Sequence, residues 1–546
     1  MNQYSPKLFD VIKKYSLSQL TKDIVSGIIV AIIALPLSIA LALASGVGPE
    51  QGIYTAIFAG FVISLLGGST VQIAGPTAAF ATIVAGIVAQ KGMDGLIIAT
   101  IMAGIILVVM GFLKFGNLIR YIPYTITTGF TLGIAITIVI GQLKDFFGLT
   151  FSHSPIETME KVAEVARSFG TFNAQAFLIG IISLAILIVG GKVLKKIPPS
   201  LIAVIVGIII VKFAHLNVKT IGDLYTISSS VPKPTLPSFS PALVMELLPN
   251  AITIAVLAAI ESLLSCVVAD GMVGSRHKPN AELIAQGAGN VMSALFGGIP
   301  ATGAIARTAA NIKNGGRTPI AGMVHSITLL LILIVLMPYA SLIPMPTIAA
   351  ILFMVAYNMS GWRACLSLVK AAPKSDITVF AITLFLTVVF DLVVAIEVGI
   401  VLAALLFLMR MAHVTEVKSW SNIDEHNDPD ATHLKDVPKE TLVYEITGPM
   451  FFAASDKLMG LNPTDNIKSV IVRMRSVPAM DITALRALKN MYKVYATKGI
   501  TLILSHVQEQ PYHVMEKAGF VDEIGQENIC ANIDASIEHA RIVNAK

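Results

Sequence analysis

Apolar runs of membrane-spanning length recur along most of this chain. A helix needs about 20 consecutive apolar residues to cross a bilayer, and the 546 residues are 55% hydrophobic and only 13% charged. We therefore expect an α-helical membrane protein with fourteen transmembrane segments, two of them shorter than a normal span. Their approximate ranges are 24–45, 52–66, 76–90, 96–113, 123–143, 175–195, 199–214, 249–270, 281–296, 303–314, 318–338, 341–357, 374–392 and 394–411.

Positively charged residues are concentrated in alternate loops between these segments. Short cytoplasmic loops of membrane proteins carry an excess of lysine and arginine. The first apolar run lacks the cleavage motif of a secretory signal, so we interpret it as a spanning helix. With the N-terminus inside, we expect the C-terminus inside as well. The basic residues of the inside loops are Lys114, Arg120, Lys192, Lys195, Lys196, Arg276, Lys278, Arg317, Arg363, Lys370 and Lys374.

The fourteen segments divide as seven and seven across the loop 215–248. An odd number of segments in each half forces the second half to insert upside down relative to the first. An offset of 225 residues sets Ala44-Ser45-Gly46 on Ala269-Asp270-Gly271, and an offset of 224 sets Pro76 on Pro300. These nearly equal offsets favour a 7+7 inverted repeat.

The two short segments each begin next to proline and glycine. They follow Gly75-Pro76-Thr77-Ala78 in the first half and Ile299-Pro300-Ala301-Thr302-Gly303 in the second. A helix that begins inside a protein leaves its first N–H groups unpaired, and these groups attract anions. We therefore predict an anion site where Thr77-Ala78-Ala79 meets Gly303-Ala304-Ile305. The alternative is that these small residues only allow close helix packing.

Arg307 lies one helical turn beyond Gly303 in an otherwise uncharged stretch. An arginine inside a membrane is costly unless it faces protein, water or an opposite charge. We interpret Arg307 as part of the positive field of the anion site. The alternatives are that it extends to the membrane surface or that it pairs structurally with an acid.

Glu261 is a second charge inside a predicted span, and Ser265 follows it by one helical turn. The i,i+4 spacing puts both polar groups on one helix face, which we expect to line the substrate site. Three roles remain open for Glu261. It can take up a proton and couple anion movement to it, because a buried carboxyl binds protons more readily than one in water. It can also be a fixed partner of Arg307, or it can help to hold a sodium ion.

Several of these motifs, in order, resemble bacterial members of the sulfate permease (SulP) or solute carrier 26 family along almost the whole chain. This resemblance implies a uracil-permease-like fold with a core and a gate domain, and transport of small anions by an elevator movement of the core. It also implies a homodimer in the lipid of the cell's inner (plasma) membrane. The matching stretches are Ala34 to Ala40, Pro49 to Tyr54, Gly67-Gly68-Ser69, Gly75 to Ala78, Glu261 to Ser265, Ala269-Asp270, Gly287 to Asn290, Gly297 to Pro300 and Arg307-Thr308.

Carried over by motif position, the resemblance implies a substrate site between segments 3 and 10. Its residues here are Thr77, Ala78, Gly303, Ala304, Ile305, Ala306 and Arg307.

The sodium-dependent bicarbonate branch of this family looks different at three positions. It is similar in overall style, but it has Asp where Glu261 stands and Thr where Ser265 and Ile305 stand. A sodium ion needs several oxygen ligands at fixed distances, and these differences weaken such a cage. We therefore favour coupling to a proton, or anion exchange, over coupling to sodium.

The last hundred residues form a second domain of ordinary soluble composition. Strands near 442–446, 469–474 and 501–505 alternate with helices near 484–496 and 533–542, which predicts an α/β layer structure. The segment resembles a STAS domain, for which a cytoplasmic regulator is a possible partner. Thr483 is either a phosphorylation site or an N-cap for the helix that follows. We predict domain boundaries at 1–412 for the membrane domain, 413–439 for a linker and 440–546 for the STAS domain.

The function that we predict is secondary active transport of a small anion such as bicarbonate, sulfate or a dicarboxylate. The chain is not expected to be an enzyme or to bind nucleic acid. The three cysteines lack metal-ligand spacing, so no metal site and no cofactor other than a coupling ion, H⁺ or Na⁺, is expected. Alternatives of other classes are an uncoupled anion channel and a nucleobase permease, although Arg307 and the STAS domain argue against the permease.

Overall fold

The computed structural model describes residues 3–12, 15–117, 123–153, 155, 157–193, 198–237, 239–390, 392–419, 437–452 and 466–545. The chain divides into two compact units, Met1–Ile400 and Val401–Lys546. Arg120, Lys195 and Lys196 of the predicted inside loops lie outside the described residues.

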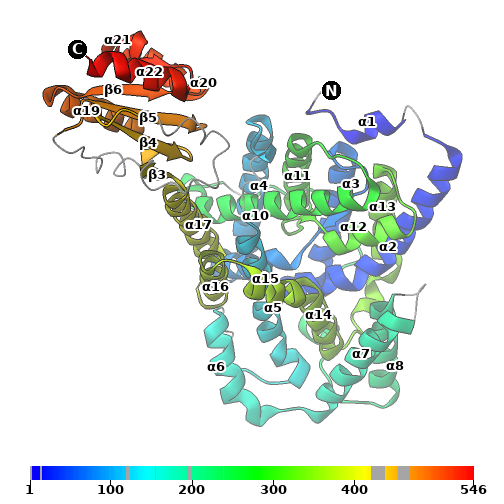
Figure 1. Ribbon diagram of the computed structural model, residues 1–546. Helices are drawn as coiled ribbons and strands as arrows, with labels where there is room; N and C mark the ends of the chain where they lie inside the picture. Colours follow the sequence, from blue (N-terminus) through cyan, green and yellow to red (C-terminus); the bar gives the residue numbers. More distant parts are fainter. Residues whose placement is uncertain are drawn as a thin grey trace. The chain divides into compact units, whose positions relative to one another are not determined.

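The first unit is almost entirely helical (Figure 1). It also has one two-stranded ribbon, formed by β1 (Ala74–Gly75) and β2 (Thr302–Gly303). Its helices, with α17 continuing into the second unit, are α1 (Lys7–Ile12), α2 (Leu17–Ala44), α3 (Pro49–Leu66), η1 (Ala78–Phe80), α4 (Ala81–Phe112), η2 (Phe115–Asn117), α5 (Tyr124–Phe147), α6 (Thr158–Ser168), η4 (Phe169–Thr171), α7 (Ala174–Val193), α8 (Pro199–Phe213), α9 (Ile221–Leu224), α10 (Pro241–Val273), α11 (Pro279–Leu295), α12 (Ile305–Lys313), α13 (Pro319–Ala340), α14 (Met345–Ser360), α15 (Trp362–Ala371), α16 (Lys374–Val389) and α17 (Leu392–Val414).

Each of the fourteen predicted segments overlaps a helix in the described part of the chain. Predicted segments 3 and 4 together correspond to η1 and α4, which follow each other without a gap. Within α4, Gly92 has a non-helical backbone (φ 65°, ψ −168°), and it lies between the predicted end of segment 3 and the predicted start of segment 4. Glycine adopts such a positive φ at little cost. In the described part of the chain, eight helices are long and apolar enough to cross a membrane by themselves. The 9-residue α12 is too short to do so.

The helices form two groups that correspond to the expected core and gate domains. In the first group, α10 and α11 pack on α4, and α13 packs on α2 and α3. In the second group, α5 packs on α14 and α16, and α7 packs on α8 and α14. Glycines allow the closest contacts of the first group: a Cβ on Gly104 of α4 would lie 2.7 Å from the carbonyl oxygen of Gly287 of α11. The first unit therefore has the helical fold that the sequence predicts.

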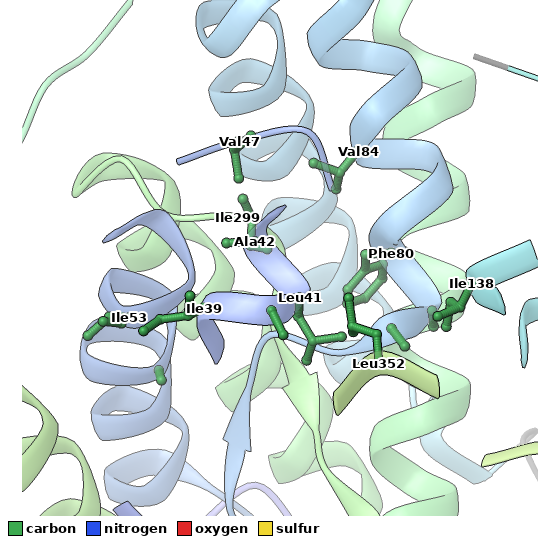
Figure 2. Packing of buried hydrophobic residues seen from close by; sticks show 14 of the residues in the cluster. Ile39, Leu41, Ala42, Val47, Ile53, Phe80, Val84, Ile138, Ile299 and Leu352 are labelled. Atoms are coloured by element: carbon green, nitrogen blue, oxygen red, sulfur yellow. The ribbon is translucent and has the colours of Figure 1, made fainter. Parts of the chain in front are cut away.

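The two groups meet around η1. The ring of Phe80, which is fully buried, lies among Leu41 of α2, Ile138 of α5 and Leu352 of α14 (Figure 2). All three neighbours are at most 5% exposed. The start of the first interrupted helix is therefore fixed by apolar contacts to helices of both groups.

The second unit contains a five-stranded sheet in the order β3-β4-β5-β6-β7. The strands β4 to β7 are parallel, and β3 joins the edge antiparallel to β4. Buried residues alternate between the two faces of β5 and β6, because successive side chains of a strand point to opposite faces. The strands are β3 (Glu416–Ser419), β4 (Thr441–Thr447), β5 (Ser469–Ser476), β6 (Thr501–Ser505) and β7 (Ile529–Cys530). The helices are α19 (Ile482–Thr497), α20 (Glu509–Lys517), α21 (Phe520–Ile524) and α22 (Ile533–Asn544), with the short turn η8 (Gln526–Asn528).

Two details of this unit differ from the sequence analysis. The strand β3 lies inside the range 413–439 that we predicted as a linker, and its pairing with β4 makes it part of the sheet. Our alternative for Thr483 as an N-cap is wrong, because the side chain of Asp481 caps α19 by accepting a hydrogen bond from the N–H of Ala484 at 2.8 Å. Thr483 is exposed in the first turn of this helix.

Candidate functional site

The two interrupted segments meet in the structure, although more than 200 residues separate them in sequence. The strands β1 and β2 pair antiparallel, with Ala74 opposite Gly303 and Gly75 opposite Thr302. The N–H of Ala304 continues this pairing by donating to the carbonyl of Ile73 at 2.9 Å. Each strand leads directly into a helix, β1 into η1 and α4, and β2 into α12. The β1–β2 ribbon therefore brings the beginnings of two helices together, as predicted.

Neither of these helices has a side-chain cap. Thr77 and Ala304 occupy the N-cap positions, and neither side chain accepts a hydrogen bond from its helix. The first N–H groups of a helix have no partner within the helix, so they remain available to an anion. At the start of α12, Ile305 is 45% exposed, and Ala306 is also exposed. Ile305 and Ala306 have apolar side chains, so at these two positions only the backbone N–H groups can donate.

Polar side chains of α11 and α3 hold the extended backbone before α12. Asn290 binds both backbone groups of Ala301, accepting from its N–H at 2.8 Å and donating to its carbonyl at 2.9 Å. Thr55 accepts from the N–H of Ile299 at 2.7 Å, and Ser293 donates to the carbonyl of Ile299 at 2.7 Å. Backbone groups outside regular structure need such partners in the interior of a membrane protein.

Arg307 is buried against Gly75 of β1 and is only 4% exposed. Its Nη2 donates a hydrogen bond to the carbonyl of Pro76, the residue before Thr77. Its Nη1 is buried without a hydrogen-bond partner among the described residues, and it lies so close to Gly75 that a Cβ there would overlap with it. The guanidinium group thus links the start of α12 to the backbone in front of η1.

Glu261 and Thr77 form a hydrogen bond, with Thr77 Oγ1 donating to Glu261 Oε2 at 2.9 Å. Both side chains are partly exposed. Among the ion pairs of the described residues, none joins Glu261 to Arg307, so the observed partner of the carboxylate is the hydroxyl group at the start of η1. Ser265, one turn further along α10, is 1% exposed, and its Oγ has no hydrogen-bond partner within the described part of the chain.

The sequence analysis missed a buried polar cluster beside the ribbon. Gln72 and Glu282 are at its centre, and the amide of Gln72 lies directly against Gly303. Glu282, Gln286 and Asn290 follow one another at a spacing of four residues along α11. This i, i+4, i+8 pattern of polar residues inside an apolar segment is the signal that predicts a buried polar helix face.

If the chain transports anions as its sequence predicts, Gly303→Ala should reduce anion uptake by about tenfold, because overpacking by one methyl group in a tight interior costs about 1–3 kcal/mol. The added Cβ would overlap with the amide of Gln72 and push β2 away from β1. Initial uptake rates at equal amounts of protein in the membrane would measure this. Gly86→Ala in α4 is the matched control, since a Cβ there would meet no atom within 4 Å. Equal rates in the two variants would contradict the tight fit of Gly303.

Two models of known protein families match this chain. The model of the Sulfate permease family matches residues 20–383, and that of the STAS domain matches residues 429–540. The chain belongs to the sulfate permease family. As a member of this family of anion transporters it is a membrane transporter and not an enzyme, and the resemblance inferred from its motifs is confirmed.

Two curated relatives in this family cover most of the chain. The chain is 38% identical to a putative sulfate transporter, YvdB, of Bacillus subtilis over 94% of its own length and 97% of that protein. It is 32% identical to the bicarbonate transporter BicA of a Picosynechococcus species over 86% of its length and 85% of that protein.

Solved structures of the sulfate permease and solute carrier 26 group show the same fold. The murine anion transporter Slc26a9 in its inward-facing state superposes with a TM-score of 0.87 at 18% identity, over 98% of this chain and 94% of that one. The transmembrane domain of a cyanobacterial BicA superposes with a TM-score of 0.63 at 29% identity, over 71% of this chain and 99% of that one.

Proposed function

We propose that this sulfate permease family member is a secondary active transporter of a small anion, either bicarbonate, sulfate or a dicarboxylate, coupled to a proton or working by exchange. The observation that carries this proposal is the meeting of two uncapped helix beginnings at the β1–β2 ribbon, with Arg307 directly behind it. Uncapped N–H groups and a buried guanidinium both favour an anion. The proposed contacts come from Thr77, Ala78, Gly303, Ala304, Ile305 and Ala306.

The charges around this site favour coupling to a proton. Each helix N-terminus is equivalent to about +0.5 of an elementary charge, so two of them contribute about +1. Arg307 adds a positive charge and ionised Glu261 removes one. Protonation of Glu261 therefore raises the net charge of the site from about +1 to about +2, which favours an anion and a proton binding together.

Transport in this proposal follows an elevator movement in which the first helix group, carrying the site, slides against the second group. The proposal also includes a location in the plasma membrane with both termini in the cytoplasm, and a homodimer whose STAS domain meets a cytoplasmic regulator. The division of the helices into two packed groups supports such a movement.

A sodium-coupled mechanism is the second candidate, and one observation favours it. The Oγ of Ser265 is buried without a hydrogen-bond partner among the described residues, one turn from the Glu261 carboxylate. A buried oxygen without a donor is a potential cation ligand, since sodium prefers hard oxygen ligands.

Uptake into proteoliposomes distinguishes these mechanisms. Labelled bicarbonate, sulfate and fumarate are offered under an imposed pH gradient, with a sodium gradient of equal size as the comparison. We expect one anion to accumulate with the pH gradient only. Accumulation driven by sodium would instead assign Glu261 and Ser265 to a cation site. Large currents without saturation would indicate a channel, and no transport of any of the three anions would contradict the proposed substrate class.

A further inference from the structure

A buried carboxylate outside the proposed site gathers five hydrogen-bond donors. Glu282 of α11 is fully buried. Its Oε1 accepts from Gln72 Nε2 at 2.7 Å, from Gln286 Nε2 at 2.9 Å and from Ser262 Oγ at 3.1 Å. Its Oε2 accepts from the N–H groups of Gly68 at 2.9 Å and Ser69 at 3.2 Å. All five partners donate to Glu282. A carboxylate can accept from all of them through its two oxygens, whereas a neutral amide of the same size has only one accepting oxygen.

The partners of Glu282 belong to the segments that carry the proposed anion site. Gly68, Ser69 and Gln72 lie in the turn that leads into β1 and η1. Ser262 is the neighbour of Glu261 on α10. One carboxylate therefore binds α10 and the segment before η1 to α11.

Gln72 extends this connection to the second ribbon strand. Its Nε2 donates to both Glu282 Oε1 and Ser262 Oγ, the latter at 2.7 Å, and its Oε1 accepts from Cys266 Sγ at 2.9 Å. These bonds fix the plane of the amide against Gly303, where a Cβ would come within 2.9 Å of Gln72 Oε1. The position of β2, and with it the start of α12, thus depends on the orientation of Gln72.

We propose that Glu282 is a positioning residue for transport, acting through Gln72. It keeps the beginnings of η1 and α12 and the Glu261 face of α10 in one rigid arrangement while the site moves. This role rests on the proposed function of the site as an anion carrier. A buried carboxylate that accepts from five donors holds the groups that donate to it in a single geometry.

An exchange of the two side chains tests the proposal in proteoliposomes of the full chain. Gln72→Glu sets a second carboxylate against Glu282, and we expect the KM for the transported anion to rise by about tenfold or more, as for strongly coupled neighbours. Adding Glu282→Gln removes the repulsion between two carboxylates at this contact, but its amide N–H₂ group cannot accept from the four donors that remain around position 282. The double variant should therefore recover only part of the loss, with a KM between that of Gln72→Glu and that of the wild type.

Glu164→Gln is the matched control for replacing a buried carboxylate. Glu164 of α6 is 1% exposed, and its Oε1 accepts from Ser152 N at 2.9 Å and Ser152 Oγ at 2.6 Å. These bonds lower the pKa of Glu164, which marks it as an ionised buried acid outside the ribbon. The KM of the Glu164→Gln variant for the transported anion should equal that of the wild type.

The outcomes separate the positioning role from the proposed function. If the wild type carries none of the three anions, the proposed function fails first. If it carries one and Gln72→Glu leaves KM unchanged, or the double variant is no better than Gln72→Glu, the positioning role is wrong. Should Gln72→Glu not reach the membrane, Gln72→Met decides: it removes the three hydrogen bonds of the Gln72 amide and leaves Glu282 four donors, and we expect KM to rise for the variant protein that is folded in the membrane. An unchanged KM there would equally overturn the role.

Discussion

Glu261→Gln should abolish anion accumulation driven by a pH gradient while leaving anion exchange intact. The amide cannot take up and release a proton near neutral pH, but its carbonyl oxygen still accepts the hydrogen bond that Thr77 Oγ1 donates at 2.9 Å. The start of η1 therefore keeps its partner, and only the proton is lost. Accumulation and counterflow of the same labelled anion, measured on one batch of proteoliposomes, would distinguish the two activities.

Glu246→Gln provides the control on the same helix. Glu246 is an exposed residue near the beginning of α10 and pairs with Lys91 at 2.6 Å. An exposed ion pair contributes at most about 1 kcal/mol, so both activities should remain close to those of the wild type. If Glu261→Gln still accumulates the anion with an unchanged pH dependence, Glu261 does not carry the proton. If it loses exchange as well, Glu261 is needed for binding itself.

Much of the fold could be predicted because a membrane-spanning helix can be identified from the residues of its own segment. A run of apolar residues predicts a span, and Gly75-Pro76 and Ile299-Pro300 mark places where a helix must begin inside the protein. The meeting of these two places followed from the inverted repeat. Arg307 and Glu261 could be identified as candidate site residues because charged residues are rare in apolar membrane segments and are usually functional there.

The contacts of these charges could not be predicted, because they join residues far apart in sequence. Nothing in the neighbourhood of Glu261 indicates that its partner is Thr77 and not Arg307. Periodicity also leaves open which way Arg307 points, and in the structure it donates to the carbonyl of Pro76. Glu282 was overlooked for a different reason: it lies near the predicted start of an apolar segment, where a charged residue is ordinarily read as facing the membrane surface.

The second large effect concerns Arg307. Arg307→Ala should weaken anion binding by about 10- to 100-fold, because a positive charge about 6 Å away contributes on the order of 3 kcal/mol at an effective dielectric constant of 20. Arg307 is 4% exposed and its guanidinium lies against Gly75 of β1, so it acts through its field and through its bond to Pro76. Binding of the transported anion to detergent-solubilised protein, measured by calorimetry, would report the change in Kd directly.

One further variant separates the charge of Arg307 from its hydrogen bond, and another serves as a control. Arg307→Lys keeps the charge and loses the planar group that reaches Pro76, so an intermediate Kd would divide the effect between field and geometry. Arg317→Ala is the control at the other end of α12, where Arg317 Nη1 donates to the carbonyls of Ile312 at 2.7 Å and Gly316 at 2.8 Å. Its Kd should stay near that of the wild type, because that end of the helix lies about 13 Å from the start at a rise of about 1.5 Å per residue. If Arg307→Ala binds the anion as tightly as Arg317→Ala does, the positive field at the ribbon comes from the helix N-termini alone, and Arg307 serves only to hold α12 against Pro76.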